Sequence, residues 1–218
     1  GGATADQEVA NITLYELGAA AAPNPTFAYD FGDAADQSGG CAGDASSADV
    51  DVVLVTSDNP SDEGAQSYSL GVAASGGSIT AITTAGTDAG GLIDGGFELS
   101  ELTSGDGNDG AITAVILSFT QPVSLAADGS SSVATVTVES TNPDGADAAT
   151  VSLEVVNGLV GGGRPVQSVV TWRGQTYRPS LGSTSYSVSS DVEAPAAPSG
   201  LAAVAGDSQV SLDWDDSA

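Results

Sequence analysis

Short segments in which apolar and polar residues alternate dominate this chain from Thr26 to about Val188. A period of two puts successive side chains on opposite faces of a β-strand, so each segment predicts a strand with one buried face. The pattern predicts strands near residues 26–31, 49–56, 66–73, 78–84, 111–119, 132–139, 149–156, 167–173, 175–178 and 184–189. Many short strands joined by Gly-, Asn-, Asp- and Ser-rich turns predict an all-β, jelly-roll-like β-sandwich.

The connections between these segments carry residues that suit tight turns. Asn142 to Gly145 and Asp128-Gly129 combine residue types that tolerate the positive φ of such turns. Arg173-Gly174 separates two strand segments and predicts a tight hairpin. No segment keeps a helical period, and we expect at most a single helical turn, at Phe97 to Leu102.

A detached strand pattern lies near the N-terminus. Residues 9–15 alternate in polarity, and an Ala-rich run with Pro23 then separates them from the rest. This separation leaves two alternatives open for the strand, which are pairing at a sheet edge of its own chain and pairing in a neighbouring molecule.

The last residues predict a second, incomplete domain. After a Pro-rich linker come a first strand segment, a Gly206-Asp207 turn, and a second segment in which Val210, Leu212 and Trp214 alternate with polar residues. This order resembles the opening of a fibronectin type III domain, which needs about seven strands. Two strands do not bury a core by themselves. We therefore expect either a longer multidomain chain, which we favour, or a partner that covers these apolar side chains.

Between the two ends, several segments resemble a cohesin-like sandwich module. The segments that carry the resemblance are Val50 to Val55, Glu63 to Val72, Ile79 to Gly86, Gly110 to Phe119 and Ser132 to Val138. The resemblance covers about residues 48–190 and implies a β-sandwich of bacterial secreted or surface proteins, often beside fibronectin type III domains. The chain departs from the family at Gly71 to Ala74, where a Tyr-Asp pair is usual, and in a Gly/Asp-rich insertion at 86–110. Dockerin binding is therefore not carried over.

These patterns divide the chain into four parts. They are an N-terminal strand and linker (1–25), a cohesin-like sandwich (26–190), a Pro-rich linker (191–199) and a partial fibronectin type III-like domain (200–218). No apolar run approaches the roughly 20 residues that span a membrane, so membrane insertion is not expected. A modular string of this kind predicts an extracellular or cell-surface location.

The charge of the chain limits its partners. The sequence has 29 acidic residues, 3 Arg and no Lys, for a net charge of −26. Nucleic acids and anionic membranes need clustered cations, so neither is an expected partner. Salt screens such a surface, and the composition favours a saline setting or a calcium-loaded surface over simple solubility. Cys41 is the only cysteine, so an intrachain disulfide is excluded. We expect Cys41 to be a small residue in a loop, and the alternative is that it forms a crosslink between chains.

Calcium is the cofactor that the acidic loops suggest, because it prefers several oxygen ligands from flexible loops. The candidate ligands are Asp106, Asn108 and Asp109 in one loop, and Asp58, Asp62 and Glu63 in another. The alternative for each loop is an ordinary solvated turn.

All the positive charge lies in residues 164–178, where a predicted hairpin carries Trp172, Arg173, Tyr177 and Arg178. These four side chains are candidate partner-binding residues, together with Val210, Leu212 and Trp214 in the C-terminal segment. The aromatic side chains either form a platform for a sugar or protein, or cover one end of the sandwich. A head-to-tail contact between this segment and an acidic face of a second copy is electrostatically favourable.

The composition also argues against catalysis. With neither His nor Lys, the chain lacks a Ser-His-Asp triad and a Lys Schiff base. We therefore expect a non-catalytic extracellular protein, a subunit or module of a cell-surface layer or filament. It would link to copies of itself or to neighbouring domains by strand pairing, with calcium. The alternative is an adhesion module of a larger secreted protein that binds a polysaccharide or a protein.

Overall fold

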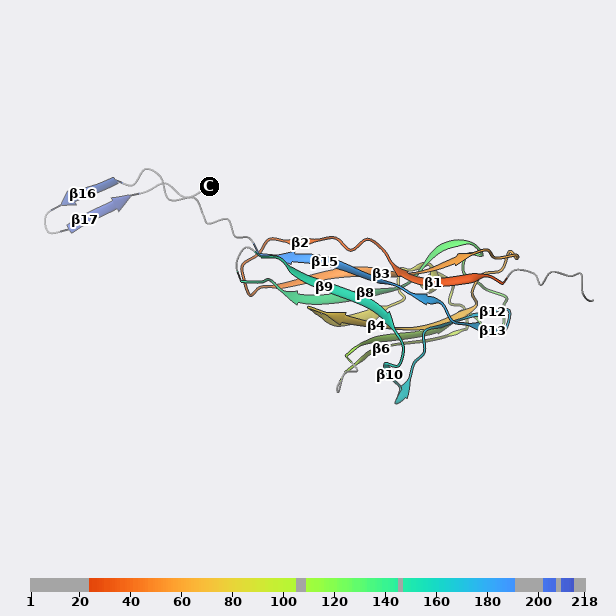
Figure 1. Ribbon diagram of the computed structural model, residues 1–218. Coiled ribbons are helices and arrows are strands. Elements are labelled where there is room, and N and C mark those ends of the chain that lie inside the picture. The colour runs from red at the N-terminus through yellow and green to blue at the C-terminus, as the bar shows by residue number, and fades with distance from the viewer. Residues whose placement is uncertain (1–23, 105–108, 145–146, 191–201, 207–208, 214–218) are drawn as a thin grey trace, which may run out of the picture.

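Two packed β-sheets form the body of the computed structural model, which describes residues 24–104, 109–144, 147–190, 202–206 and 209–213 (Figure 1). The first sheet has the order β14-β1-β3-β8-β5. Its strands are β1 (Thr26–Phe31), β3 (Ala45–Ser57), β5 (Ser78–Thr83), β8 (Gly129–Thr141) and β14 (Ser180–Leu181). The predicted all-β sandwich is therefore confirmed.

The second sheet has the order β13-β12-β4-β9-β15-β2, and β7 also pairs with β4 and carries β6 beyond it. Its strands are β2 (Gln37–Ser38), β4 (Ser67–Ser75), β6 (Phe97–Thr103), β7 (Gly110–Ile116), β9 (Ala149–Val156), β12 (Val169–Trp172), β13 (Gln175–Tyr177) and β15 (Ser183–Ser189). Two short strands, β10 (Val160–Gly161) and β11 (Arg164–Pro165), form a separate hairpin. Among the described residues, no helix has the length and apolar character needed to cross a membrane.

The alternation in the sequence explains the core. Every second residue of the long strands faces inward and is almost fully buried. Such residues include Val50, Val52, Leu54, Leu70, Val72, Val136, Val138, Val151 and Leu153. Burying a side chain of this size contributes roughly 1.5–3 kcal/mol, so this shared interior is the main term that holds the two sheets together.

The structure corrects the expected helical turn at Phe97 to Leu102. These residues belong to β6, which pairs with β7 over its whole length. Apolar and polar residues alternate only from Phe97 to Ser100, and the polar Glu101 then moves Leu102 to the opposite face, so the strand signal is weak. The helix that exists, α1 (Asp88–Leu92), begins after Thr87, whose side chain accepts a hydrogen bond from Gly90 N. The sequence did not predict this helix, because two of its five residues are glycine, which is a poor helix former.

The predicted C-terminal strands pair with each other. β16 (Ala202–Gly206) and β17 (Gln209–Asp213) form an antiparallel two-stranded sheet that is separate from the two large sheets. The side chains of Val210 and Leu212 are outside the description, as are Trp214 and residues 9–15. The fibronectin type III resemblance and the pairing partner of the N-terminal strand therefore stay predictions.

One edge of β4 is shared by two strands. Gly71 pairs with Ile112 of β7 on one side and with Val156 of β9 on the other. Ser69 pairs likewise with β7 and, in place of β9, with Val169 of β12. The chain therefore leaves the edge of β4 after β9, makes an excursion over residues 157–168, and returns to the same edge as β12.

Two tyrosines cross the core in opposite directions and bond to carbonyl groups where the ladders are irregular. Tyr29 of β1 donates its hydroxyl hydrogen to the carbonyl oxygens of Ser69 and Val169, both at 3.0 Å, beside the gap between β9 and β12. Tyr68 of β4 donates to the carbonyl of Val133 at 2.6 Å. Burial raises the pKa of both tyrosines above the ordinary value, so their hydroxyls stay protonated donors.

Val133 is the extra residue of a β-bulge in β8. Val52 of β3 pairs with Ala134, while the next residue, Val53, pairs with Ser132, so Val133 has no partner in β3. The residue before it also bonds outside the ladder, because Ser132 N donates to the Asp88 carboxylate at 2.8 Å. The first residue of α1 and a tyrosine from the opposite sheet thus complete the hydrogen bonding of this bulge.

We predict that Tyr68→Phe lowers the free energy of unfolding by about 1–3 kcal/mol, because it leaves the buried Val133 carbonyl without a donor. Tyr186→Phe is the matched control. Tyr186 is as buried as Tyr68, at 3% exposure, but its hydroxyl has no hydrogen-bond partner among the described residues. Urea unfolding followed by Trp fluorescence checks both variants. Equal effects of the two substitutions would contradict the assigned role of the Tyr68 hydroxyl.

Candidate functional site

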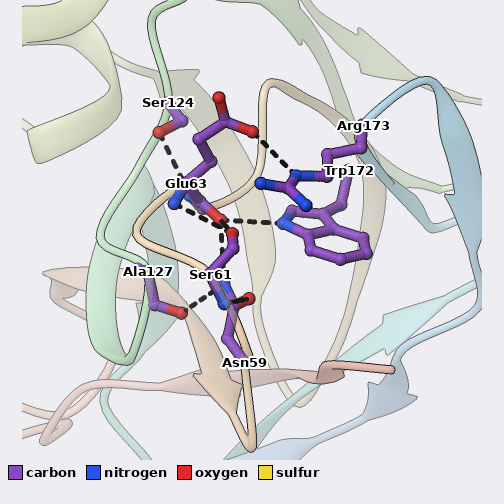
Figure 2. Close-up of polar contacts among 8 residues, drawn as sticks. Asn59, Ser61, Glu63, Ser124, Ala127, Trp172 and Arg173 are labelled. Atoms are coloured by element: carbon purple, nitrogen blue, oxygen red, sulfur yellow. Dashed lines mark hydrogen bonds and ion pairs between the residues drawn. The ribbon is translucent and has the colours of Figure 1, made fainter. Parts of the chain in front are cut away.

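The acidic loop after β3 is organised by a single carbonyl group (Figure 2). The Glu63 carbonyl oxygen accepts hydrogen bonds from Asn59 Nδ2 (2.8 Å), Ser61 Oγ (3.1 Å) and Trp172 Nε1 (2.7 Å). Asn59 Nδ2 also donates to the Ala127 carbonyl at 2.9 Å, which ties the loop to the segment before β8. The loop is therefore fixed to two other parts of the chain.

The predicted calcium ligands in this loop do not converge. Asp58 and Asp62 are exposed, and the Glu63 carboxylate pairs with Arg173 at 2.8 Å. In the other acidic loop, Asp109 is exposed, whereas Asp106 and Asn108 lie outside the described residues. Within the described ranges, no three His, Cys, Asp or Glu side chains gather closely enough to hold a metal ion. Calcium at either loop stays a prediction.

The aromatic hairpin closes one end of the core. Trp172 is only 7% exposed, and its ring meets Tyr177 edge-on with centroids 6.0 Å apart. Tyr177 in turn packs edge-on against Phe27 at 5.4 Å. The Arg173 guanidinium lies 5.1 Å from the centre of the Trp172 ring. Of the two alternatives for Trp172, the structure supports a side chain that covers one end of the sandwich, because a buried indole offers no platform to a sugar. The side chains of Arg173 and Arg178 are exposed.

A more open surface lies on the outer face of β6, β7, β4 and β12, and sequence analysis did not identify it. Cross-strand registers place two rows of outward-facing residues across these strands. The rows are Phe97, Ile116, Ser67 and Thr171, and Leu99, Ala114, Ser69 and Val169. We call these eight residues the apolar face. All are partly or largely exposed, and Phe97 is 47% exposed.

The outer face of the other sheet has a different chemistry. There, Thr135 Oγ1 donates to Asp51 and Thr137 Oγ1 to Asp49, each at 2.6 Å, in a cross-strand ladder of hydroxyls and carboxylates. Such a face is satisfied by water and by its own hydrogen bonds. The outer face of the first sheet also carries the partly exposed Val53 and Val55, but Phe97, at 47% exposure, is the most exposed large apolar side chain on either of these two faces.

The excursion at residues 157–168 bounds the apolar face on one side. Leu159 is 6% exposed and packs on the outer surface of the second sheet, where an added Cβ at Gly71 would lie 3.2 Å from its Cδ1. Gly162 N donates to the Glu101 carboxylate of β6, which holds the tip of the excursion down. Ile112 is fully buried beneath it. The row of outward-facing residues next to the apolar face is thus covered by the chain itself.

A small cavity of about 300 Å³ adjoins the opposite side of the apolar face. Its lining combines apolar side chains with amides and hydroxyls, namely Gln66, Ser67, Ile116, Ser118, Gln121, Pro122, Val123 and Thr171. Phe119, in the same loop as Gln121, is 66% exposed. One signal of this surface was present in the sequence. Residues 111–119 are apolar at almost every position, which indicates a strand with two apolar faces rather than one.

Comparisons with known proteins found similar solved structures but no match among protein-family models or curated proteins. A type I cohesin from Clostridium thermocellum, solved in complex with a dockerin, has a TM-score of 0.41 and 13% identity, over 76% of this chain and 99% of that chain. The seventh ScaB type I cohesin from Pseudobacteroides cellulosolvens has a TM-score of 0.38 and 12% identity, over 79% and 96%. The sixth cohesin of Acetivibrio cellulolyticus scaffoldin B, also in complex with a dockerin, has a TM-score of 0.39 and 14% identity, over 76% and 99%. These neighbours belong to the group that the sequence motifs resemble, and the sandwich itself follows from the strand pairings above.

We predict that Trp172→Phe destabilises the fold more than Glu63→Gln does. The first change removes the Trp172 Nε1 donor from the Glu63 carbonyl and shrinks a buried ring, at a cost of about 2–4 kcal/mol. The second removes the charge from an ion pair whose side chains are 50% and 43% exposed, which costs less than about 1 kcal/mol. Thermal unfolding of both variants in low and high salt checks this order. A larger loss for Glu63→Gln would show that the ion pair, not the indole, fixes the hairpin.

Proposed function

We propose that this chain is a non-catalytic protein-interaction module of an extracellular or cell-surface assembly, and that it binds a partner protein through the apolar face. The observation that carries this proposal is the difference between the two outer faces of the sandwich. One carries a ladder of Thr and Asp beside the partly exposed Val53 and Val55, and the other presents Phe97, Leu99 and Ile116 to solvent. Exposed apolar patches of this kind on a soluble domain mark interaction sites.

The size and shape of the apolar face suit a protein segment. Four neighbouring strands at about 4.8 Å spacing span roughly 15 Å, and two rows on each strand add about 7 Å. The cavity beside Ile116 offers a place for one side chain of the partner. Interface energy concentrates in a few central apolar anchors, so Phe97 and Ile116, which are paired across β6 and β7, are the residues expected to matter most.

Strand pairing, calcium and carbohydrate binding, which the sequence also suggested, depend on features other than the apolar face. Linking by strand pairing depends on residues 9–15 and on the C-terminal segment, of which β16 and β17 pair with each other. The strongly negative charge supports an assembly that works in salt or with calcium. The alternative is a carbohydrate-binding adhesion module, and its main candidate for a sugar-binding residue, Trp172, is buried.

We predict that the double variant Phe97→Asp/Ile116→Asp loses binding to selected partners at least about 30-fold, the effect of removing interface anchors. The bait is the folded chain, and the probes are dockerin modules and phage-displayed random peptides selected on it. Affinity is measured by biolayer interferometry, with a glycan array run in parallel.

Ala81→Asp/Thr83→Asp is the matched control, because it adds the same charge at two exposed positions of β5 in the other sheet. Binders whose affinity falls equally with both variants would attribute the loss to charge rather than to the apolar face. Glycan binding that survives while peptide binding is absent would favour the adhesion alternative.

A further inference from the structure

β6 forms one margin of the second sheet, and its far side is open. Among the described residues, the backbone of β6 pairs only with β7, in an unbroken register that runs from Phe97 with Ile116 to Thr103 with Gly110. An open strand edge presents a row of backbone N–H and C=O groups that can pair with another chain. One more strand can therefore be added to the sheet at β6.

The other marginal strands are less suited to such pairing. β2, β13 and β14 have only two or three residues each. β5, at the margin of the first sheet, has a register shift between Ile79 and Ala81, and irregularities of this kind protect a sheet edge. β6 has seven residues without Lys or Pro, and its two carboxylates, Glu98 and Glu101, accept hydrogen bonds from neighbouring parts of the same chain. Of these margins, β6 has the least protection.

β6 also exposes apolar side chains on both of its faces. Phe97 and Leu99 point outward and belong to the apolar face. Leu102 lies on the opposite side of the strand, toward the first sheet, yet it is 50% exposed. A cavity of about 410 Å³ adjoins Leu102 and is lined in part by Ala74 and Ile79. A strand with apolar residues on both faces would therefore bury apolar surface on each side of this edge.

We propose that this edge receives residues 9–15 of a second copy of the chain as an additional strand. The segment has no charged residue, although the whole chain has a net charge of −26. Its alternation places Ile12 and Leu14 on one face, where they would join Leu102 beside the cavity. Tyr15 lies on the other face of the segment and would extend the apolar face. Backbone hydrogen bonds supply affinity in strand addition, and side-chain pockets supply specificity.

The residues before β1 favour a second copy over pairing within one molecule. Pro25 is buried and continues the alternation of β1, and Ala22 and Asn24 each precede a proline, a position that favours extended backbone. Four extended residues lead the chain about 12 Å away from the sandwich. β6 lies opposite β5, which is three strands from β1, so the distance across the sandwich is about 17 Å. Residues 16–21 would have to be almost fully extended to return over both distances, whereas a second copy imposes no such condition.

The proposed contact joins two different surfaces, since each copy donates one strand and accepts another. Contacts of this kind continue from copy to copy and build a row of subunits. The contact uses the edge of β6 and needs no partner on the apolar face. It therefore stands whether or not the function proposed above is correct.

Sedimentation velocity of the full chain tests the proposal, in about 1 M NaCl to screen the negative charge. We expect the wild type to self-associate as its concentration rises. Ile12→Asp/Leu14→Asp in the donor segment and Leu102→Asp at the acceptor edge should each weaken this association at least about tenfold, because charges at the contact oppose strand pairing. Tm is measured for each variant to confirm that it folds.

Each variant has a matched control. Ala20→Asp/Ala22→Asp adds the same two charges outside residues 9–15, and Thr80→Asp adds one charge at an exposed position of β5. Both controls should associate as the wild type does. Hydrogen exchange of the wild type gives a readout that needs no substitution, since the amides of residues 97–103 should exchange more slowly at higher protein concentration.

Mixing the two variants distinguishes pairing between molecules from pairing within one. Ile12→Asp/Leu14→Asp keeps an intact β6, and Leu102→Asp keeps an intact donor segment, so the mixture should form a heterodimer that neither variant forms alone. A wild type that stays monomeric would overturn the proposal. So would a mixture that does not associate, protection of β6 that is independent of concentration, or equal losses in the variants and their controls.

Discussion

Two hydroxyl groups from opposite sheets hold together the places where this sandwich is irregular. Tyr68 reaches from the second sheet to the carbonyl of the bulged Val133, and Tyr29 reaches from the first sheet to the edge of β4. Tyr68 satisfies the buried Val133 carbonyl at the bulge, which would otherwise be a polar group without a partner in an apolar interior. Tyr29 donates to the carbonyl groups of the partly exposed Ser69 and Val169, beside the break between β9 and β12. At each irregularity, a tyrosine that crosses the core therefore bonds to the backbone.

The same break shapes the surface proposed to bind a partner. Residues 157–168 leave the edge of β4 and cover Ile112, while Phe97 and Ile116, which are paired two rows away, stay open. The aromatic residues that looked most suitable for a ligand, Trp172 and Tyr177, instead pack inward and fix the acidic loop. The surface proposed to bind a partner thus lies on the flat part of a sheet, and the aromatic hairpin belongs to the core.

The sequence predicted most of the long strands because alternation and turn residues are local signals. It did not predict β6, where the alternation breaks at Ser100 and Glu101. It also did not predict α1, which begins at the Thr87 cap but contains two glycines, a residue type with low helix propensity. For the apolar face, the only indication in the sequence was that residues of β7 are apolar on both faces of the strand. The apolar face depends on registers between β6, β7, β4 and β12, and cross-strand neighbours are far apart in sequence.

The excursion between β9 and β12 has a further consequence for how such a module can change over evolutionary time. Its two ends are held by the same edge of β4, one at Val156 opposite Gly71 and the other at Val169 opposite Ser69. An insertion at the exposed residues 163–165, between these points, alters neither these registers nor the packing of Leu159. The rim of the apolar face is therefore free to diversify while the scaffold stays constant, as hypervariable loops do on other β-sandwiches.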